Sequence, residues 1–141
     1  GYLAHTTASL SILARLELAM TAGASFGARS TVYHALEMDK VIEAAIRKQG
    51  FGLVEAVSYC HTTFGRINKL GAAADMMRTL KDNSISKSAY DRLSDDERGT
   101  NARIVRGVLH TKTRPEYTKV YHTLVDRIHE EAIQTRNYGG N

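Results

Sequence analysis

The pattern of apolar and polar positions predicts helices that alternate with strands. Residues 10–22 carry leucine and methionine at helical spacing, and Gly23 is placed to end that helix. A short strand is expected over residues 25–29. Residues 37–49 then place apolar side chains on one face of a second helix, which Gly50 ends. This order of elements favours an α/β fold with parallel strand pairing.

Residues 51–57 form the most apolar short run of the chain, broken only by Glu55. A continuous apolar run of this length is typical of a strand covered on both faces of a parallel sheet. Three further elements are expected, namely a helix over 72–80, a strand over 104–109 and a last helix from Arg114 towards Ala132 with Pro115 in its first turn. Between them, residues 81–103 are polar and predict a surface segment.

Bulk composition narrows the class of protein without identifying it. A chain of 141 residues is enough for one domain with a single core. The net charge of +4 fits an acidic partner such as an electron carrier, whereas the dispersed Lys and Arg and the lack of a recognition motif argue against nucleic acid. No apolar run reaches the roughly 20 residues of a membrane span, and no signal-peptide pattern opens the chain. With one cysteine, a cytoplasmic protein is expected.

Cys60 is the single cysteine and lies where the apolar run 51–57 gives way to a polar loop. Taken alone, it has three interpretations: a small buried side chain, a nucleophile paired with His61 or His34, or a metal ligand whose companions come from elsewhere. Glu55 likewise has two interpretations. It either pairs with a nearby Arg or Lys, or it supports the loop that carries Cys60.

Several blocks of the sequence, taken in order, resemble the C-terminal half of the β subunit of 2-oxoacid:ferredoxin oxidoreductases, and the 2-oxoglutarate type most closely. Residues 16–29 end in a pattern similar to the family's Gly-Ala-x-Phe-x-Ala-Arg. Residues 52–66 read Gly-Leu-Val-Glu-Ala-Val-Ser-Tyr-Cys-His-Thr-Thr-Phe-Gly-Arg and resemble its strand and Cys loop, usually Ser-Pro-Cys-Pro-Thr-x-Phe-Gly-Arg. Residues 107–110 and 114–117 are similar to a family tail.

The resemblance implies an α/β fold that is the C-terminal half of a thiamine-diphosphate-binding fold, with a parallel sheet flanked by helices. It implies that Cys60 is the fourth ligand of a [4Fe-4S] cluster and that Thr62, Thr63 and Gly65 shape the loop around it. No catalytic residue is expected in this chain. The implied activity is oxidative decarboxylation of a 2-oxoacid, with 2-oxoglutarate as the expected substrate, to acyl-CoA with electron transfer to ferredoxin. The implied partners are the α subunit, ferredoxin, the 2-oxoacid and coenzyme A.

The chain departs from the family in two respects. The Gly-Asp-Gly…Asn motif that binds thiamine diphosphate and Mg²⁺ is absent, as are the other cluster cysteines, so most ligands of these cofactors are expected outside the chain. His5, Tyr59 and His61 stand where the family usually has Pro. We therefore expect residues 1–141 to be the C-terminal part of one domain, with an α/β core and Cys loop at 1–80, the surface segment at 81–103, and a strand plus helix at 104–141.

Two alternatives to this function stay open from the sequence. One is a non-catalytic α/β interaction domain related to the subunit, which would have no cofactor and no dependence on Cys60. The other is a relative specific for pyruvate or a branched-chain 2-oxoacid. Nothing in the sequence identifies the side chain of the substrate.

Overall fold

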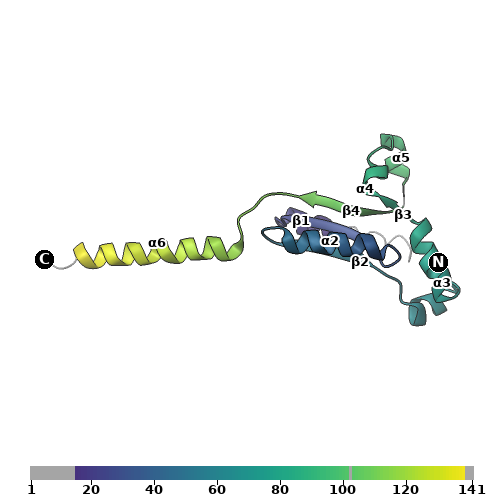
Figure 1. Cartoon of the computed structure of the whole chain (residues 1–141), viewed down its shortest axis with the longest axis horizontal. Coiled ribbons are helices and arrows are strands. Elements are labelled where there is room, and N and C mark those ends of the chain that lie inside the picture. Colours follow the sequence, from purple (N-terminus) through teal and green to yellow (C-terminus); the bar gives the residue numbers. More distant parts are fainter. Residues whose placement is uncertain (1–14, 102, 139–141) are drawn as a thin grey trace.

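The computed structural model describes residues 15–101 and 103–138. A helix over residues 15–21 leads into a four-stranded sheet whose order is β2-β1-β4-β3 (Figure 1). The elements that follow it are β1 (Phe26–Thr31), α2 (Ala35–Arg47), β2 (Gly52–Val57), η1 (His61–Gly65), α3 (Ala73–Asp82), β3 (Ser84–Ser86), α4 (Lys87–Tyr90), α5 (Asp95–Thr100), β4 (Ile104–Thr111) and α6 (Tyr117–Tyr138). The α/β class expected from the sequence is confirmed, and the architecture is consistent with a thiamine-diphosphate-binding-like fold.

The sheet is mixed rather than wholly parallel. β1 pairs in parallel with β2, and β3 pairs in parallel with β4, but β4 runs antiparallel to β1 with an irregularity between Gly27 and Ala28. The expectation of parallel pairing is right for β1 and β2, which the helix α2 connects. It is wrong for β4, because the long segment between β2 and β4 lets that strand return in the opposite direction. The segment 81–103 itself contributes β3, α4 and α5.

β1 is the central strand of the core, and all six of its residues are buried. On one face, Phe26 and Ala28 pack with Val41 of α2, and Ala44, Ala45 and Val54 surround them. On the other face, Leu16 of the first helix lies over Gly27, where an added Cβ would come within 3.1 Å of the leucine Cδ1. Small side chains in β1 therefore allow helices to approach the sheet from both sides.

β2 lies at the edge of the sheet, contrary to the prediction from its sequence. Only Val57 of this strand is buried, whereas Gly52 and Ala56 are exposed. The apolar run predicted a strand covered on both faces, but that environment belongs to β1, whose sequence is more polar. Periodicity cannot distinguish a central strand from an edge strand, because both can be apolar.

α6 extends away from the sheet as a separate rod at one end of the molecule (Figure 1). Six of its large apolar or aromatic side chains are exposed, namely Tyr117, Val120, Tyr121, Leu124, Ile128 and Ile133, whereas Val125 is partly buried. The last helix predicted from Pro115 is thus present, and it starts two residues after the proline. In the described part of the chain, no helix is both long and apolar enough to cross a membrane.

Candidate functional site

The turn that follows β2 holds the residues that the sequence singled out. Val57 ends the strand, and its carbonyl accepts a hydrogen bond from the amide of Val32 at 3.0 Å, which ties β2 to the end of β1. Three residues later, Cys60 is extended, with φ −81° and ψ 103°, and it caps the short helix η1. The chain thus enters a helical turn directly after the cysteine, so the first free amides of that turn lie close to its sulfur.

Cys60 is exposed, and hydrogen bonds converge on its sulfur. The Sγ atom lies 3.3 Å from the hydroxyl Oγ1 of Thr62. Hydrogen bonds from the Thr62 side chain, and then from the backbone amides of Thr63 and Phe64, lower the pKa of the Cys60 thiol to about 6. No charged group contributes to this shift, so the turn alone stabilises the thiolate. The interpretation of Cys60 as a buried small side chain is wrong.

The turn is compact on its inner side. The amide of Gly65 donates to the carbonyl of Cys60 at 2.9 Å, and the Gly65 carbonyl accepts from the amide of Leu70 at 2.9 Å. Gly65 is buried, and a Cβ built on it would lie 2.5 Å from the Sδ atom of Met76 in α3. The rings of Tyr59 and Phe64 stack at a centroid distance of 5.9 Å beside the cysteine.

The structure therefore brings together all four residues proposed from the sequence, Cys60, Thr62, Thr63 and Gly65. Their cofactor roles stay predictions, although their placement suits a soft metal ligand held by N–H and O–H donors. Sequence reasoning missed Met76 and the Tyr59–Phe64 stack. The Met76 contact depends on how α3 packs on η1, and the Tyr59–Phe64 stack depends on the conformation of the turn itself, so no spacing in the sequence indicates either of them.

Neither proposed partner base is engaged with Cys60. His34 bonds instead through Nδ1 to the hydroxyl of Thr31 at 2.7 Å, and its pKa is lowered first by burial and then by the Arg106 guanidinium. Across the described residues, no group of three or more His, Cys, Asp or Glu side chains could hold a metal ion. The turn can thus supply one thiolate ligand, and any further ligands must come from other residues.

Glu55 pairs with an arginine, as the first of its two interpretations predicted. Its Oε2 atom accepts from Nε of Arg29 at 2.6 Å, and the side chains are 13% and 3% exposed. The two residues are directly opposite in the β1–β2 register. Because Glu55 lies on β2 five residues before Cys60, the pair also fixes the strand that leads into the Cys60 turn.

A second polar cluster lies beside α2. Glu37 pairs with Arg106 of β4 and accepts a hydrogen bond from the hydroxyl of Ser30 at 3.2 Å. Ser30 is fully buried, so this hydrogen bond satisfies a hydroxyl that has no access to water. The cluster joins β1, α2 and β4, and its role is to hold the polar end of the core together.

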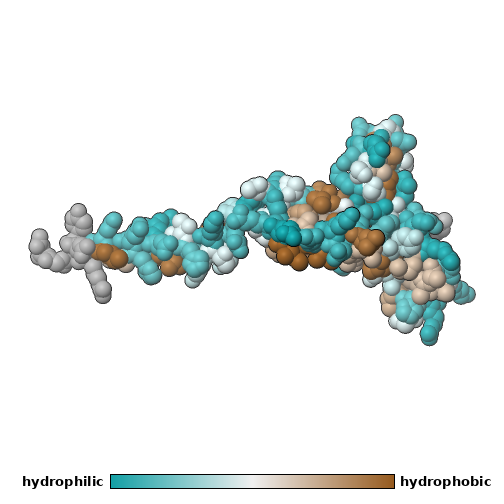
Figure 2. Space-filling view, in the orientation of Figure 1, coloured by the Kyte–Doolittle hydropathy of each residue, from teal (hydrophilic) through white to brown (hydrophobic). Residues whose placement is uncertain are grey.

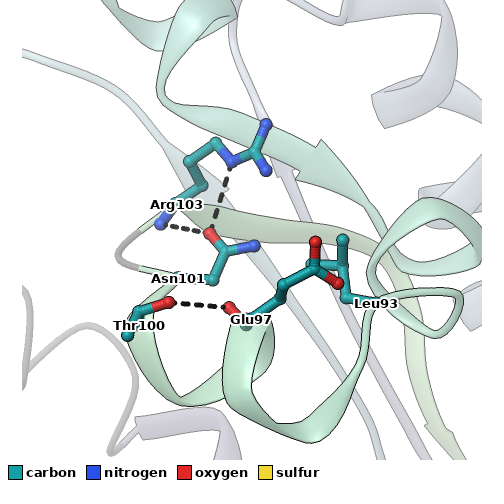
Figure 3. A pocket seen from close by; sticks show the side chains of 5 residues that line it. All are labelled: Leu93, Glu97, Thr100, Asn101 and Arg103. Atoms are coloured by element: carbon teal, nitrogen blue, oxygen red, sulfur yellow. Dashed lines mark hydrogen bonds between the residues drawn. The ribbon is translucent and has the colours of Figure 1, made fainter.

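The hollow beside α5 has a volume of about 330 Å³ and is lined by Leu93, Glu97, Thr100, Asn101 and Arg103 (Figure 3). Some of its polar groups bond one another: the Asn101 side-chain oxygen accepts from the Arg103 amide at 2.9 Å, and the Thr100 hydroxyl donates to the Glu97 carbonyl at 3.3 Å. The carboxylate of Glu97 accepts from the amide and hydroxyl of Ser94, which lowers the pKa of Glu97. This capping arrangement accounts for the carboxylate without a ligand.

Fold and site together define an α/β protein that presents an activated cysteine thiolate on a turn after a parallel strand. Comparison with known proteins gives a more specific assignment. The chain is 35% identical over 115 residues to a protein of Methanocaldococcus jannaschii named 2-oxoglutarate synthase subunit KorB, a match that covers 82% of this chain. It is 34% identical over 110 residues, or 78% of this chain, to the protein of that name from Methanothermobacter thermautotrophicus.

These matches confirm the resemblance seen in the motifs: over the aligned residues, the chain is homologous to β subunits of 2-oxoacid:ferredoxin oxidoreductases. The aligned region spans only 42% and 38% of the lengths of these two relatives. A shorter match to the KorB subunit of Archaeoglobus fulgidus has 40% identity over 67 residues, which is 48% of this chain and 23% of that protein. No family model matches the chain, and no solved structure matches it significantly.

Proposed function

We propose that this chain acts as part of the β subunit of a 2-oxoglutarate:ferredoxin oxidoreductase, and that Cys60 is one ligand of its [4Fe-4S] cluster. The observation that carries the proposal is the Cys60 thiolate, exposed and held by one hydroxyl and two backbone amides. The homologues are named as subunits of 2-oxoglutarate synthase, and these names support 2-oxoacids as the substrate class. When bound, such a cluster accepts and passes on single electrons.

The residues of the turn fit one corner of an iron–sulfur cluster. Iron binds the deprotonated thiol, and the pKa of Cys60 near 6 keeps it deprotonated at neutral pH. Donors to a ligating sulfur withdraw negative charge from it, which tunes the potential of the bound group. Thr62, Thr63 and Phe64 supply these donors, so this chain both binds the metal and adjusts its redox behaviour.

The described residues do not fit thiamine diphosphate or Mg²⁺. The diphosphate-binding motif is absent from the sequence, and no three or more His, Cys, Asp or Glu side chains of the described residues come together where they could hold a divalent cation. We therefore propose that residues outside this chain carry out decarboxylation. This chain then contributes only to the transfer of electrons out of the site. The α subunit, coenzyme A, the 2-oxoacid and ferredoxin are the partners that this proposal requires.

The surface next to Cys60 is suited to binding an acidic electron acceptor. Arg66 and Lys69 are exposed on the same turn, and no acidic residue occurs between Tyr59 and Gly71. An exposed Ile67 adds apolar area that is 74% accessible. Two exposed basic side chains beside an exposed apolar one suit transient docking of an acidic redox protein, because long-range attraction speeds the encounter.

The experiment that tests the proposal is substitution of Cys60 by Ala in the full-length subunit purified with its partner subunits. We expect loss of the cluster signal in electron paramagnetic resonance, lower bound iron, and no reduction of ferredoxin, with an unchanged circular dichroism spectrum. Thr62→Val is the matched control within the turn and should keep the cluster with an altered potential. Normal iron content in the Cys60→Ala enzyme would contradict the assignment. Assays with 2-oxoglutarate and pyruvate in parallel test the substrate.

A further inference from the structure

The turn that presents Cys60 packs against one neighbouring helix. Among the described elements, η1 makes its main contact with α3. That contact centres on Met76, which is 3% exposed, and on the buried Gly65. A Cβ on Gly65 would lie 2.5 Å from Sδ and 3.2 Å from Cε of Met76, so the end of the methionine side chain fills the space that glycine leaves.

Gly65 is also the residue through which the turn closes on Cys60. Its amide donates to the Cys60 carbonyl at 2.9 Å, and its carbonyl accepts from the Leu70 amide at 2.9 Å. A shift of Gly65 would therefore move the whole turn from Cys60 to Leu70. The amides of Thr63 and Phe64, which donate to the cysteine sulfur, lie inside that turn.

Met76 is well placed to resist such a shift. It lies in α3, whose start is capped by a hydrogen bond from the Ala72 amide to Oδ2 of Asp75 at 3.0 Å. One turn further along, Leu80 is 1% exposed and anchors the same face of the helix. By packing on Gly65, the Met76 side chain therefore holds an otherwise exposed turn in place against a fixed helix.

We propose that Met76 is a positioning residue for Cys60: by packing on Gly65 it fixes the turn that aims the backbone amides at the cysteine sulfur. The consequence for an iron–sulfur cluster rests on the proposed function. The effect on the turn itself does not, because the Met76–Gly65 contact exists whether or not Cys60 binds metal.

Met77 supplies a matched control. It is the next residue of α3 and the same residue type, yet it is only partly buried and faces a separate hollow beside Tyr33 and Lys81. Met77→Ala removes the same atoms from the same helix without touching Gly65. Met76→Leu nearly preserves side-chain volume, so it should restore what Met76→Ala loses.

The test uses the intact enzyme and two readouts other than activity. Hydrogen exchange is followed in the peptide spanning residues 58–66, and iron loss to a chelator is timed. In Met76→Ala we expect both rates to rise about tenfold or more, as is typical when support around a metal ligand is removed. Met76→Leu and Met77→Ala should stay within about twofold of the parent in both rates, since substitutions that spare such support change little.

Gly65→Ala provides a second variant if Met76→Ala does not fold, because its added Cβ displaces the same sulfur and should also raise both rates. Exchange in Met76→Ala or Gly65→Ala that matches Met77→Ala would overturn the proposal. Retention of the cluster in Cys60→Ala would instead refute the proposed function, while the exchange measurement would still decide the role of Met76.

Discussion

Arg29 and Glu55 face each other across the β1–β2 register, with Nε and Oε2 2.6 Å apart and both side chains largely shielded from water. An ion pair in such a place stabilises the fold only while both partners are present, because either charge alone would be buried without compensation. The pair is therefore a fixed point on the strand that leads to Cys60.

Removing one member of this pair should destabilise the protein strongly. We expect Arg29→Ala to lower the free energy of unfolding by about 3–5 kcal/mol, because it leaves the Glu55 carboxylate without its partner. Urea denaturation measures this change. The control is Glu43→Gln, which breaks the exposed Arg47–Glu43 pair and should cost less than about 1 kcal/mol. Equal effects of the two variants would show that the Arg29–Glu55 pair is not effectively buried.

The reactivity of Cys60 should depend on pH in a defined direction. Only the thiolate is alkylated, so the rate with iodoacetamide in the metal-free protein should rise with pH and level off above the thiol pKa of about 6. Thr62→Val removes the first cause of the lowered pKa, and we expect its rate profile to move towards higher pH. A parent profile with its midpoint near 9 would show that the amides of the turn do not reach the sulfur.

Helices cover both faces of β1, and the first helix does so with one of its faces only. Substitution of two leucines of that helix should therefore change the free energy of unfolding by different amounts. Leu16 is 1% exposed and lies over Gly27, whereas Leu18 is 70% exposed. We expect Leu16→Ala to lower the free energy of unfolding by about 2–5 kcal/mol. Leu18→Ala should change it by less than about 0.5 kcal/mol. Similar losses in the two variants would mean that the helix covers the sheet with a different face.

α6 should be the least protected helix of the isolated 141-residue chain. A single helix in water gains little stability unless its apolar face is buried, and Figure 2 shows α6 mostly hydrophilic with separate hydrophobic side chains exposed along it. We expect its amides to exchange hydrogen much faster than those of β1. Slow exchange in α6 at low protein concentration would indicate that it packs against the sheet after all.

A good part of the fold could be predicted from single stretches of sequence. The helix predicted over residues 37–49 from its apolar face corresponds to Ala35–Arg47, the short strand predicted over 25–29 corresponds to Phe26–Thr31, and glycines mark where elements end. The Cys60 turn was found because an apolar run meets a polar loop there and because its motif resembles a known family. Both are local signals, which need no knowledge of distant contacts.

The sequence alone thus predicted the class of fold and the order of the longer helices and strands, and it singled out Cys60, but it did not predict β3, α4 or α5. Only the tertiary structure decided that β1 is the central strand and β2 an edge, that β4 runs antiparallel to β1, and that Met76 packs on Gly65. The reason is physical: burial and strand direction depend on residues far apart in the chain. The lowered pKa of Cys60 belongs to the same group, because the turn must form before its amides can converge on the sulfur.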